Sequence, residues 1–328
     1  MPQGEVVSFT WCDRLDFSGI SVVLLGDLVL DRFLFGTTVR VSREAPVPVI
    51  RYEGETLLPG GAANAAANLA SLGGQVAVVG LVGIDAAGDQ LCQLLQSSGV
   101  DLQGVVRSDR RSTITKTRVM AGGLGTVRQQ VLRLDREPDE EIDRETQQKL
   151  TGHLDALRSQ ADVLVLSDYG YGAIQPEALD LGSGPPAVVD SRGQLRRFRG
   201  AHTLKPNHEE LSQDAGGALH STHAIDKAAQ ALRSASDADA VLVTLGRHGM
   251  RMAQSSGVQA IPAHGDAEVA DVTGAGDSVL AAYTLAVGSG WSPHEAAELA
   301  TVAGGIAVAH HGTHQVRIDE ILGALDHD

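Results

Sequence analysis

The run Asp-Val-Thr-Gly-Ala-Gly-Asp occupies residues 271–277 and leads into the apolar stretch 278–287, which has the composition of a buried helix. Gly274 and Gly276 permit a tight turn and leave backbone N–H groups uncovered. The first N–H groups of a helix have no acceptor within it, and the helix dipole places positive potential at the same end. The run therefore predicts an anion hole made by Gly274, Ala275 and Gly276, suited to a phosphate group.

Asp277 is the predicted general base beside this anion hole. Side chains in the first turn of a helix lean back toward its N-terminus. A carboxylate there can take the proton of an alcohol while the transferred phosphoryl group lies on the N–H groups. A simpler interpretation uses the same residues: the glycines form a turn and Asp277 caps a helix.

Outside this run, short apolar segments alternate with helical patterns. This alternation predicts an α/β domain with a mostly parallel sheet covered on both faces. Residues 1–15 are expected to form a peripheral extension. The expected strands are 21–26, 75–80, 162–166, 187–190, 202–204 and 240–245, and the expected helices are 60–72, 87–97, 224–235, 274–287, 293–309 and 318–325.

Two stretches, about 33–58 and 112–135, break the alternation. They are rich in Val, Thr and Arg and show no helical period. We interpret them as strands of a small separate sheet, inserted into a single domain that spans residues 1–328. Such an appendage commonly covers a site or makes a subunit contact.

The composition excludes several classes of partner. With 41 acidic and 26 basic side chains the net charge is −15, which argues against nucleic acid, although not against a small anion. Residues 20–35 form the most apolar early run, which is too short and too charged to span a membrane. No signal peptide opens the chain, and Cys12 and Cys92 have no metal or redox spacing. A cytoplasmic protein is expected.

Further runs, in order and spacing, resemble the PfkB-type, ribokinase-like carbohydrate kinases. They lie at residues 26–31, 59–68, 80–88 and 205–210, together with 271–277. The resemblance extends from about Ser21 to the C-terminus. It implies a ribokinase-like three-layer α/β/α fold whose small β-sheet is a lid, ATP and Mg²⁺ as cofactors, and a homodimer formed through the lid sheets.

The resemblance also implies roles for single residues near the sugar and the metal. Asp31, Gly60, Gly61 and Asn64 are expected to bind sugar hydroxyls, which carboxylates and uncovered backbone suit well. Asn207 and Glu210 would orient Mg²⁺ through water, because this ion keeps much of its hydration. The same pair also has the spacing of a helix capping box, and both interpretations can hold together.

The nucleotide side is assigned in the same way. Thr244 and Gly246 match the nucleotide loop of the family, and Lys205 could reach a nucleotide phosphate. The adenine pocket is expected near the helix 293–309. Asp271 and Thr273 resemble positions that bind a monovalent cation such as K⁺, although a buried turn uses these residue types equally well.

Finer features resemble one branch, the bacterial kinases of D-glycero-D-manno-heptose 7-phosphate. The runs are 31–32, 41–49, 113–119, 130–135 and 167–169. Enzymes of this branch transfer the ATP γ-phosphoryl group to O1, giving the 1,7-bisphosphate on the way to ADP-heptose. Many are fused to a nucleotidyltransferase domain, for which this chain is too short, so the stand-alone form is expected.

A 7-phosphate requires cations away from the reacting hydroxyl. The candidates are Lys116, Arg118, Arg133 and Arg192, since Arg offers paired donors to phosphate and Lys a point charge. Arg192 stands where this branch is expected to have Lys. A solvated basic face is the alternative for each residue.

Other functions stay open. Another kinase of this fold, for ribose, fructose or a nucleoside, is the nearest alternative, and neither the anomer nor the later pathway is specified. An oxidoreductase would need a Gly-x-Gly-x-x-Gly turn that residues 26–31 lack, and a silent binder would not need Asp277. His310, His311 and His314 have no Cys or acidic partner at ligand spacing, so we expect a helix end and no zinc site.

Overall fold

The computed structural model describes residues 11–123, 127–138, 140–265, 271–310 and 312–325. Its centre is a nine-stranded sheet in the order β13-β12-β11-β10-β9-β8-β1-β4-β5, parallel except for β12 and β13. The strands are β1 (Ser21–Gly26), β4 (Gln75–Gly83), β5 (Asp101–Ser108), β8 (Val163–Asp168), β9 (Ala187–Ser191), β10 (Thr203–Leu204), β11 (Ala240–Thr244), β12 (Met250–Gln254) and β13 (Gly257–Ile261).

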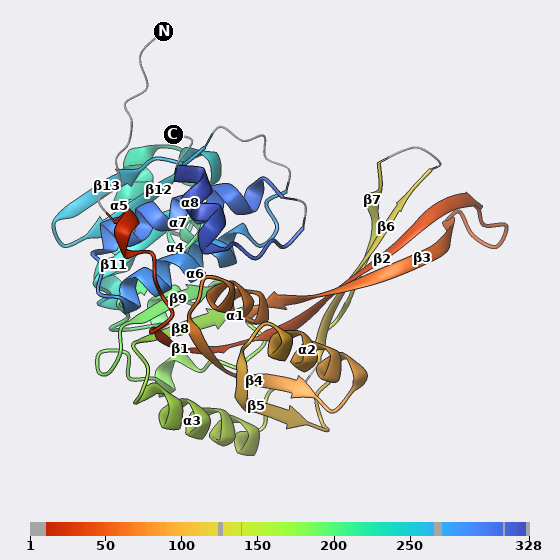
Figure 1. Cartoon of the computed structure of the whole chain (residues 1–328), viewed down its shortest axis with the longest axis horizontal. Coiled ribbons are helices and arrows are strands. Elements are labelled where there is room, and N and C mark those ends of the chain that lie inside the picture. The colour runs from red at the N-terminus through yellow and green to blue at the C-terminus, as the bar shows by residue number, and fades with distance from the viewer. Residues whose placement is uncertain (1–10, 124–126, 139, 266–270, 311, 326–328) are drawn as a thin grey trace, which may run out of the picture.

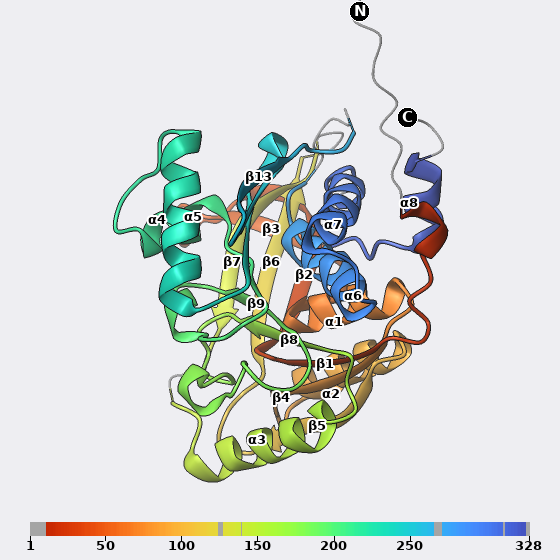
Figure 2. The ribbon, with the colours of Figure 1, turned by 90° about the vertical axis from the view of Figure 1, so that its left-hand side faces the viewer.

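Helices cover both faces of this sheet (Figure 1, Figure 2). Val22 and Leu24 of β1 pack into one core and Val23 and Leu25 into the other, because successive side chains of a strand point to opposite faces. The first core includes α1 (Ala62–Ser71), α2 (Ala86–Ser97), α6 (Ala275–Gly288), α7 (Pro293–Val308) and α8 (Ile318–Leu325). The second includes α3 (Arg144–Arg158), α4 (His208–Asp214) and α5 (Thr222–Ser236).

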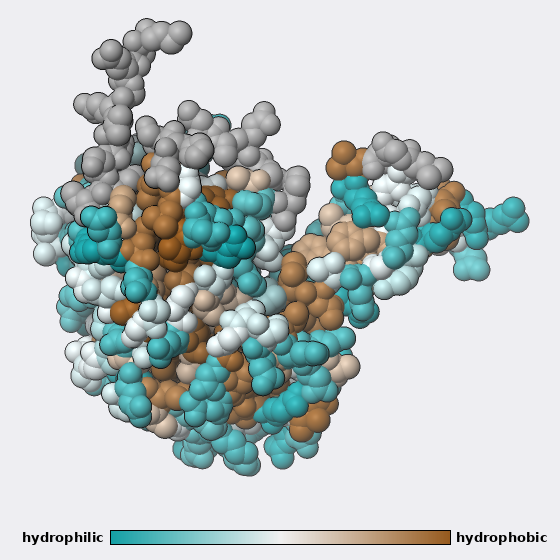
Figure 3. Space-filling view, viewed as in Figure 1, coloured by the Kyte–Doolittle hydropathy of each residue, from teal (hydrophilic) through white to brown (hydrophobic). Residues whose placement is uncertain are grey.

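A second, four-stranded sheet projects from this body (Figure 1). We call it the small sheet. Its order is β3-β2-β6-β7, with β2 and β6 parallel, and it consists of β2 (Leu28–Val41), β3 (Pro48–Gly61), β6 (Ile114–Gly122) and β7 (Gln129–Arg136). In Figure 3 a hollow separates its outer part from the body. The expected fold, a mostly parallel sheet between helices plus a small separate sheet, is confirmed.

Some local expectations were wrong. The helix expected from residue 60 begins at Ala62, because β3 continues to Gly61, where φ is +55°. Part of the expected peripheral extension is core: Trp11 is buried and its ring packs on Trp291 at 5.6 Å between centroids. No helix of the described residues is long and apolar enough to cross a membrane.

Candidate active site

The chemically active side chains gather at the carboxyl ends of the parallel strands. Asp27 follows β1, Asp168 ends β8, Arg192 follows β9, Lys205 follows β10 and Thr244 ends β11. Ligands of open α/β sheets bind at this edge. The N-terminus of α6 reaches the same place, since Asp277 in its first turn contacts Tyr169, which follows β8.

Asp277 is a buried carboxylate with both oxygens hydrogen-bonded. Asn64 Nδ2 donates to Oδ2 at 2.6 Å, and the Tyr169 hydroxyl donates to Oδ1 at 3.2 Å. Burial raises the pKa of Asp277 to about 6, while the hydrogen bond from Asn64 acts in the opposite direction. The group is therefore ionised at neutral pH and can accept a proton.

The glycines before Asp277 form the expected turn. Gly274 is the N-cap of α6 with φ of +81°, and a Cβ there would lie 3.1 Å from Asn64 Nδ2. The Ala275 N–H makes a long bond of 3.4 Å to the Val272 carbonyl. Within the described part of the chain, the N–H groups of Gly274 and Gly276 have no acceptor. Their use as an anion hole stays a prediction.

Asp31 lies directly against the Gly60 backbone, where β2 and β3 pair. A Cβ on Gly60 would come within 2.6 Å of Asp31 Oδ2, so only glycine allows this approach. The opposite oxygen, Oδ1, accepts a bond of 2.6 Å from Arg118 Nη1. Arg118, expected at the substrate phosphate, is thus paired with the carboxylate expected to bind sugar. Gly61 is the last residue of β3 and the N-cap of α1.

Lys116, a residue of β6 in the small sheet, lies close to two tyrosines. It is 7% exposed, and its Nζ is 5.8 Å and 5.5 Å from the ring centres of Tyr169 and Tyr171. The Arg192 guanidinium lies 4.4 Å from the Tyr169 ring. Burial lowers the pKa of Lys116, and the charges of Arg192 and Arg133 lower it further. Three of the four expected cations therefore share one region.

Arg133 is the most strongly engaged of these three cations. It forms a two-pronged ion pair with Asp135, its neighbour two positions along β7, at 2.8 Å and 2.6 Å. Among the described residues, Lys116 has no such ion pair. Arg192 likewise has no ion pair among the described residues, so Lys116 and Arg192 are the two cations with most capacity for an incoming anion.

The sequence prediction missed Asp27 and Tyr169 as site residues. Asp27 is 3% exposed and accepts backbone N–H bonds from Tyr169, Tyr171 and Ala173 at 2.9, 3.0 and 3.1 Å. It therefore holds the loop that carries both tyrosines. The sequence signal for Asp27 was a carboxylate directly after a buried strand. Burial raises the pKa of Asp27.

Lys205 is buried beside Asp190, with 2.9 Å between Nζ and Oδ2. Burial acts to lower the pKa of Lys205, but Asp190 outweighs it and the pKa is raised. Nearby, Asn207 and Glu210 form the expected capping box, with two reciprocal bonds of 2.8 Å. The capping interpretation is confirmed, and the role in Mg²⁺ binding stays a prediction.

A cavity of about 260 Å³ adjoins the glycine turn at the start of α6. Thr244 and Gly246 line it on one side, and Ala275 and Gly276 on another. Its walls are otherwise largely apolar and come from β12, α6, α7 and neighbouring loops; they include Met250, Val272, Val279, Thr301, Gly304, Gly305 and Val308. The shape and lining suit a flat heteroaromatic ring.

Asp271 joins the loop before α6 to the loop after α7. Its Oδ1 accepts from the backbone N–H and hydroxyl of Thr273 at 2.9 and 2.7 Å, and its Oδ2 accepts from the Gly312 N–H at 3.0 Å. The turn interpretation of this pair therefore applies. Binding of a monovalent cation stays a prediction.

A buried carboxylate at a helix N-terminus, beside a largely apolar cavity, suits a phosphotransferase that acts on a hydroxyl group. The chain belongs to the pfkB family of carbohydrate kinases, whose family model matches residues 21–319. It is a carbohydrate kinase acting on a sugar hydroxyl.

Several relatives carry the name bifunctional protein HldE. That of Mesorhizobium japonicum is 38% identical over 316 residues, covering 94% of this chain and 62% of the relative. That of Halorhodospira halophila is 41% identical over 315 residues, covering 94% and 64%. The chain thus spans less than two thirds of the length of these relatives.

Solved structures share the fold. Phosphofructokinase-2 from Escherichia coli in complex with potassium has a TM-score of 0.79 at 22% identity, covering 94% of this chain and 98% of the other. Arabidopsis thaliana ribokinase complexed with ribose and ATP has a TM-score of 0.70 at 22% identity, covering 93% and 98%.

Proposed function

We propose that this kinase transfers the γ-phosphoryl group of ATP to O1 of D-glycero-D-manno-heptose 7-phosphate, giving the 1,7-bisphosphate, a precursor of nucleotide-activated heptose. The observation that carries the proposal is the position of Asp277. This ionisable carboxylate accepts a hydrogen bond from Asn64 of α1. Helix α1 directly follows the end of β3, where Gly60 lies against Asp31. On its other side, the glycine turn opens into the cavity.

Asp277 would take the proton of the sugar O1 hydroxyl. Asn64 and Tyr169 hold its two oxygens in place, so the carboxylate needs little reorientation when the hydroxyl arrives. A pKa of about 6 keeps it ionised at neutral pH, yet leaves it more basic than an ordinary aspartate. The attacking oxygen gains negative charge as its proton leaves for Asp277.

ATP would lie with its base in the cavity and its terminal phosphates on the turn. Gly274 and Gly276 lie at the start of α6, where the dipole favours negative charge. Thr244 and Gly246 would contact the ribose or the phosphates. The Lys205 charge, held by Asp190, adds positive potential at this edge.

Mg²⁺ would be held, through water, by Glu210 and Asn207. Glu210 fits this role because it is a partly buried carboxylate whose pKa burial raises, and one of its oxygens is engaged by the Asn207 N–H. When bound, the ion neutralises charge on the ATP phosphates. Asp271 and Thr273 would support a monovalent cation such as K⁺ from the adjoining loop.

The phosphate of the sugar would lie on Lys116, with Arg192 and Arg133 around it. A buried ammonium gains most from an incoming anion, because its own solvation is already lost. Arg118 has a different proposed role: its ion pair with Asp31 orients the carboxylate that accepts sugar hydroxyls. Asp31 and Lys116 are neighbours in the β2–β6 register, so one strand pair would hold both ends of the substrate.

The small sheet would pair with that of a second copy. Every residue of β7 is exposed, and among the described residues eight of the eleven exposed large hydrophobic side chains belong to the small sheet and its turns. The eight are Val39, Val41, Val47, Tyr52, Val127, Val131, Leu132 and Leu134. This concentration of exposed apolar side chains on a projecting sheet favours a homodimer through the lid sheets.

We place the enzyme in the cytoplasm, acting without nucleic-acid or membrane partners. The net charge of −15 disfavours binding to nucleic acid. The proposed substrates, ATP and a sugar phosphate, are intracellular anions. Cys12 and Cys92, both in the described part of the chain, are not joined in a disulfide.

Asp277→Asn tests the assignment of the base. Turnover should fall by about 10²–10⁴-fold, the usual contribution of a general base, while ATP binds with nearly unchanged affinity. The measurements are steady-state kinetics and calorimetric titration with a non-hydrolysable ATP analogue. Retained turnover would show that another group accepts the proton.

A further inference from the structure

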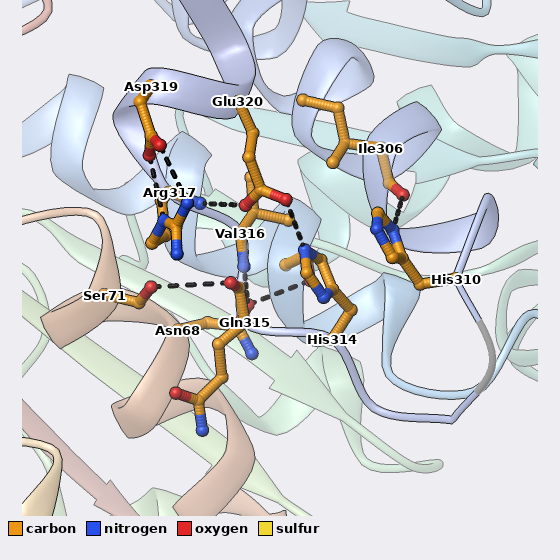
Figure 4. Close-up of polar contacts among 11 residues, drawn as sticks. Asn68, Ser71, Ile306, His310, His314, Gln315, Val316, Arg317, Asp319 and Glu320 are labelled. Atoms are coloured by element: carbon orange, nitrogen blue, oxygen red, sulfur yellow. Dashed lines mark hydrogen bonds and ion pairs between the residues drawn. The ribbon is translucent and has the colours of Figure 1, made fainter.

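Two histidines and a glutamate meet where the chain leaves α7 and enters α8 (Figure 4). His310 follows α7, His314 lies in the connecting loop and Glu320 is in the first turn of α8. One ring nitrogen from each histidine and one carboxylate oxygen all lie within 4.8 Å of one another. The two imidazole rings are stacked, 3.7 Å between centres and 5° from parallel.

The sequence shows no Cys or acidic partner at ligand spacing for these histidines, but the fold brings an acidic partner to them. Glu320 Oε1 lies 2.8 Å from His314 Nε2. The spacing of six positions concealed the pair, because the loop turns into α8 between the two residues. His311 lies outside the described residues.

The surrounding hydrogen bonds leave a nitrogen of His310 and an oxygen of Glu320 available to a metal. His310 Nδ1 is 3.0 Å from the Ile306 carbonyl, which can only accept, so Nδ1 carries the proton and Nε2 keeps its lone pair. Glu320 Oε2 accepts the Arg317 N–H at 2.9 Å, which leaves Oε1 for another partner. A histidine that donates its second nitrogen to a carbonyl is the usual arrangement around bound metals.

We propose that His310, His314 and Glu320 bind a divalent transition metal of the zinc class, with water completing the coordination. Two nitrogens and one carboxylate oxygen suit Zn²⁺, whereas Mg²⁺ and Ca²⁺ prefer more oxygen ligands. Metal bonds of about 2.1 Å in a tetrahedron place ligand atoms about 3.4 Å apart. The group therefore has to contract from separations of up to 4.8 Å, and one of the two stacked rings has to turn so that both nitrogen lone pairs reach the ion.

The metal would tie α7 to α8 and fix the loop between them. That loop packs on α1: the Val316 N–H lies 3.4 Å from Asn68 Oδ1, and the Ser71 hydroxyl lies 3.5 Å from the Gln315 carbonyl. Asn68 in turn bonds to the Asn64 carbonyl at 3.0 Å. Occupancy should therefore raise the thermal stability of this part of the fold.

The test is zinc binding by the full chain after chelator treatment, measured by competition with a chromophoric zinc indicator. We expect one Zn²⁺ per chain with micromolar affinity and a higher melting temperature with the metal. His310→Ala with His314→Ala should weaken binding at least tenfold and abolish the thermal shift. Glu320→Gln should weaken binding as well.

His294→Ala is the matched control, because His294 faces Glu298 on α7 at 3.5 Å without a second histidine. It should bind zinc as the unaltered chain does. His310→Ala alone, at an exposed position, keeps the test valid if the double variant does not fold. Equal affinity in the unaltered chain and His310→Ala, or no saturable binding by the unaltered chain, would overturn the proposal.

Discussion

The side-chain amide of Asn64 donates a hydrogen bond of 2.6 Å to Oδ2 of Asp277, although 213 positions separate the two residues. The bond joins the first turns of α1 and α6, two helices that each begin directly after a glycine, Gly61 for α1 and Gly274 for α6. A residue expected to touch only sugar thus also orients and tunes the proposed base.

Asn64→Ala should change the pH dependence of the reaction. The Asn64 bond lowers the pKa of Asp277, so its removal raises that pKa above about 6. The base works only when deprotonated, and kcat/KM falls as pH drops through its pKa. The acid limb of kcat/KM should therefore move to higher pH. An unshifted acid limb would mean that a different group controls it.

Asp277→Asn should make the ligand-free chain more stable at pH 8. Because the folded pKa, about 6, lies above the ordinary aspartate value of 3.8, stability falls as pH rises between these values and stays lowered above them. The asparagine removes this penalty, which is at most about 3 kcal/mol. Thermal melts at pH 8 and pH 4 measure it: the gain should shrink at pH 4. A variant less stable at pH 8 would contradict the burial argument.

Lys116→Ala should raise KM for a sugar phosphate at least tenfold, as expected for the loss of a charge-assisted contact to phosphate. The KM of the unphosphorylated sugar should change little. Lys149→Ala is the control, because Lys149 is exposed on α3 and paired only with Glu145. If Lys116→Ala raised KM equally for both substrates, Lys116 would not be the residue that binds the sugar phosphate group.

Val272→Asp should weaken the binding of ATP and leave the binding of the sugar unchanged. Val272 is 70% exposed and lines the cavity, so a carboxylate there repels the nucleotide phosphates at little cost to folding. KM for ATP should rise about tenfold or more. Ile84→Asp, at a position 66% exposed, is the matched control. An unchanged KM for ATP would place the nucleotide elsewhere.

Leu132→Glu combined with Leu134→Glu should convert the proposed dimer into a monomer. The two side chains point to the same face of β7 and are 57% and 64% exposed. Light scattering during gel filtration gives the mass. Leu322→Glu, at a position 44% exposed on α8, should remain dimeric. A monomeric unaltered chain would refute the dimer itself.

Local pattern predicted much of this molecule. The glycine turn and apolar run gave α6 almost to the residue, and apolar runs placed most parallel strands. Helix α3 was missed, since only Thr146, Leu150 and Leu154 of it are buried, although Asp143 caps it. β5, β12 and β13 were not assigned either, because each is short or only partly buried, and only the capping box of Asn207 and Glu210 indicated α4.

Contacts between distant segments were beyond prediction. The pairing of Arg118 with Asp31 depends on the register of β2 against β6. The hydrogen bonds that Asp27 accepts from the loop after β8 depend on the order of strands in the sheet. A one-residue change of register would turn each side chain to the other face. The residue types alone pointed to Arg118 and Asp31 as functional groups, but the contacts that they and Asp27 make depend on the fold.

The central claim is tested most directly by assaying phosphoryl transfer from ATP across sugars and sugar phosphates, with phosphorus NMR locating the new phosphate. We predict the highest kcat/KM with D-glycero-D-manno-heptose 7-phosphate, and a new phosphate on the anomeric oxygen, coupled to the anomeric proton. Preference for ribose, a nucleoside or fructose 6-phosphate, or a phosphate on a non-anomeric oxygen, would contradict the account.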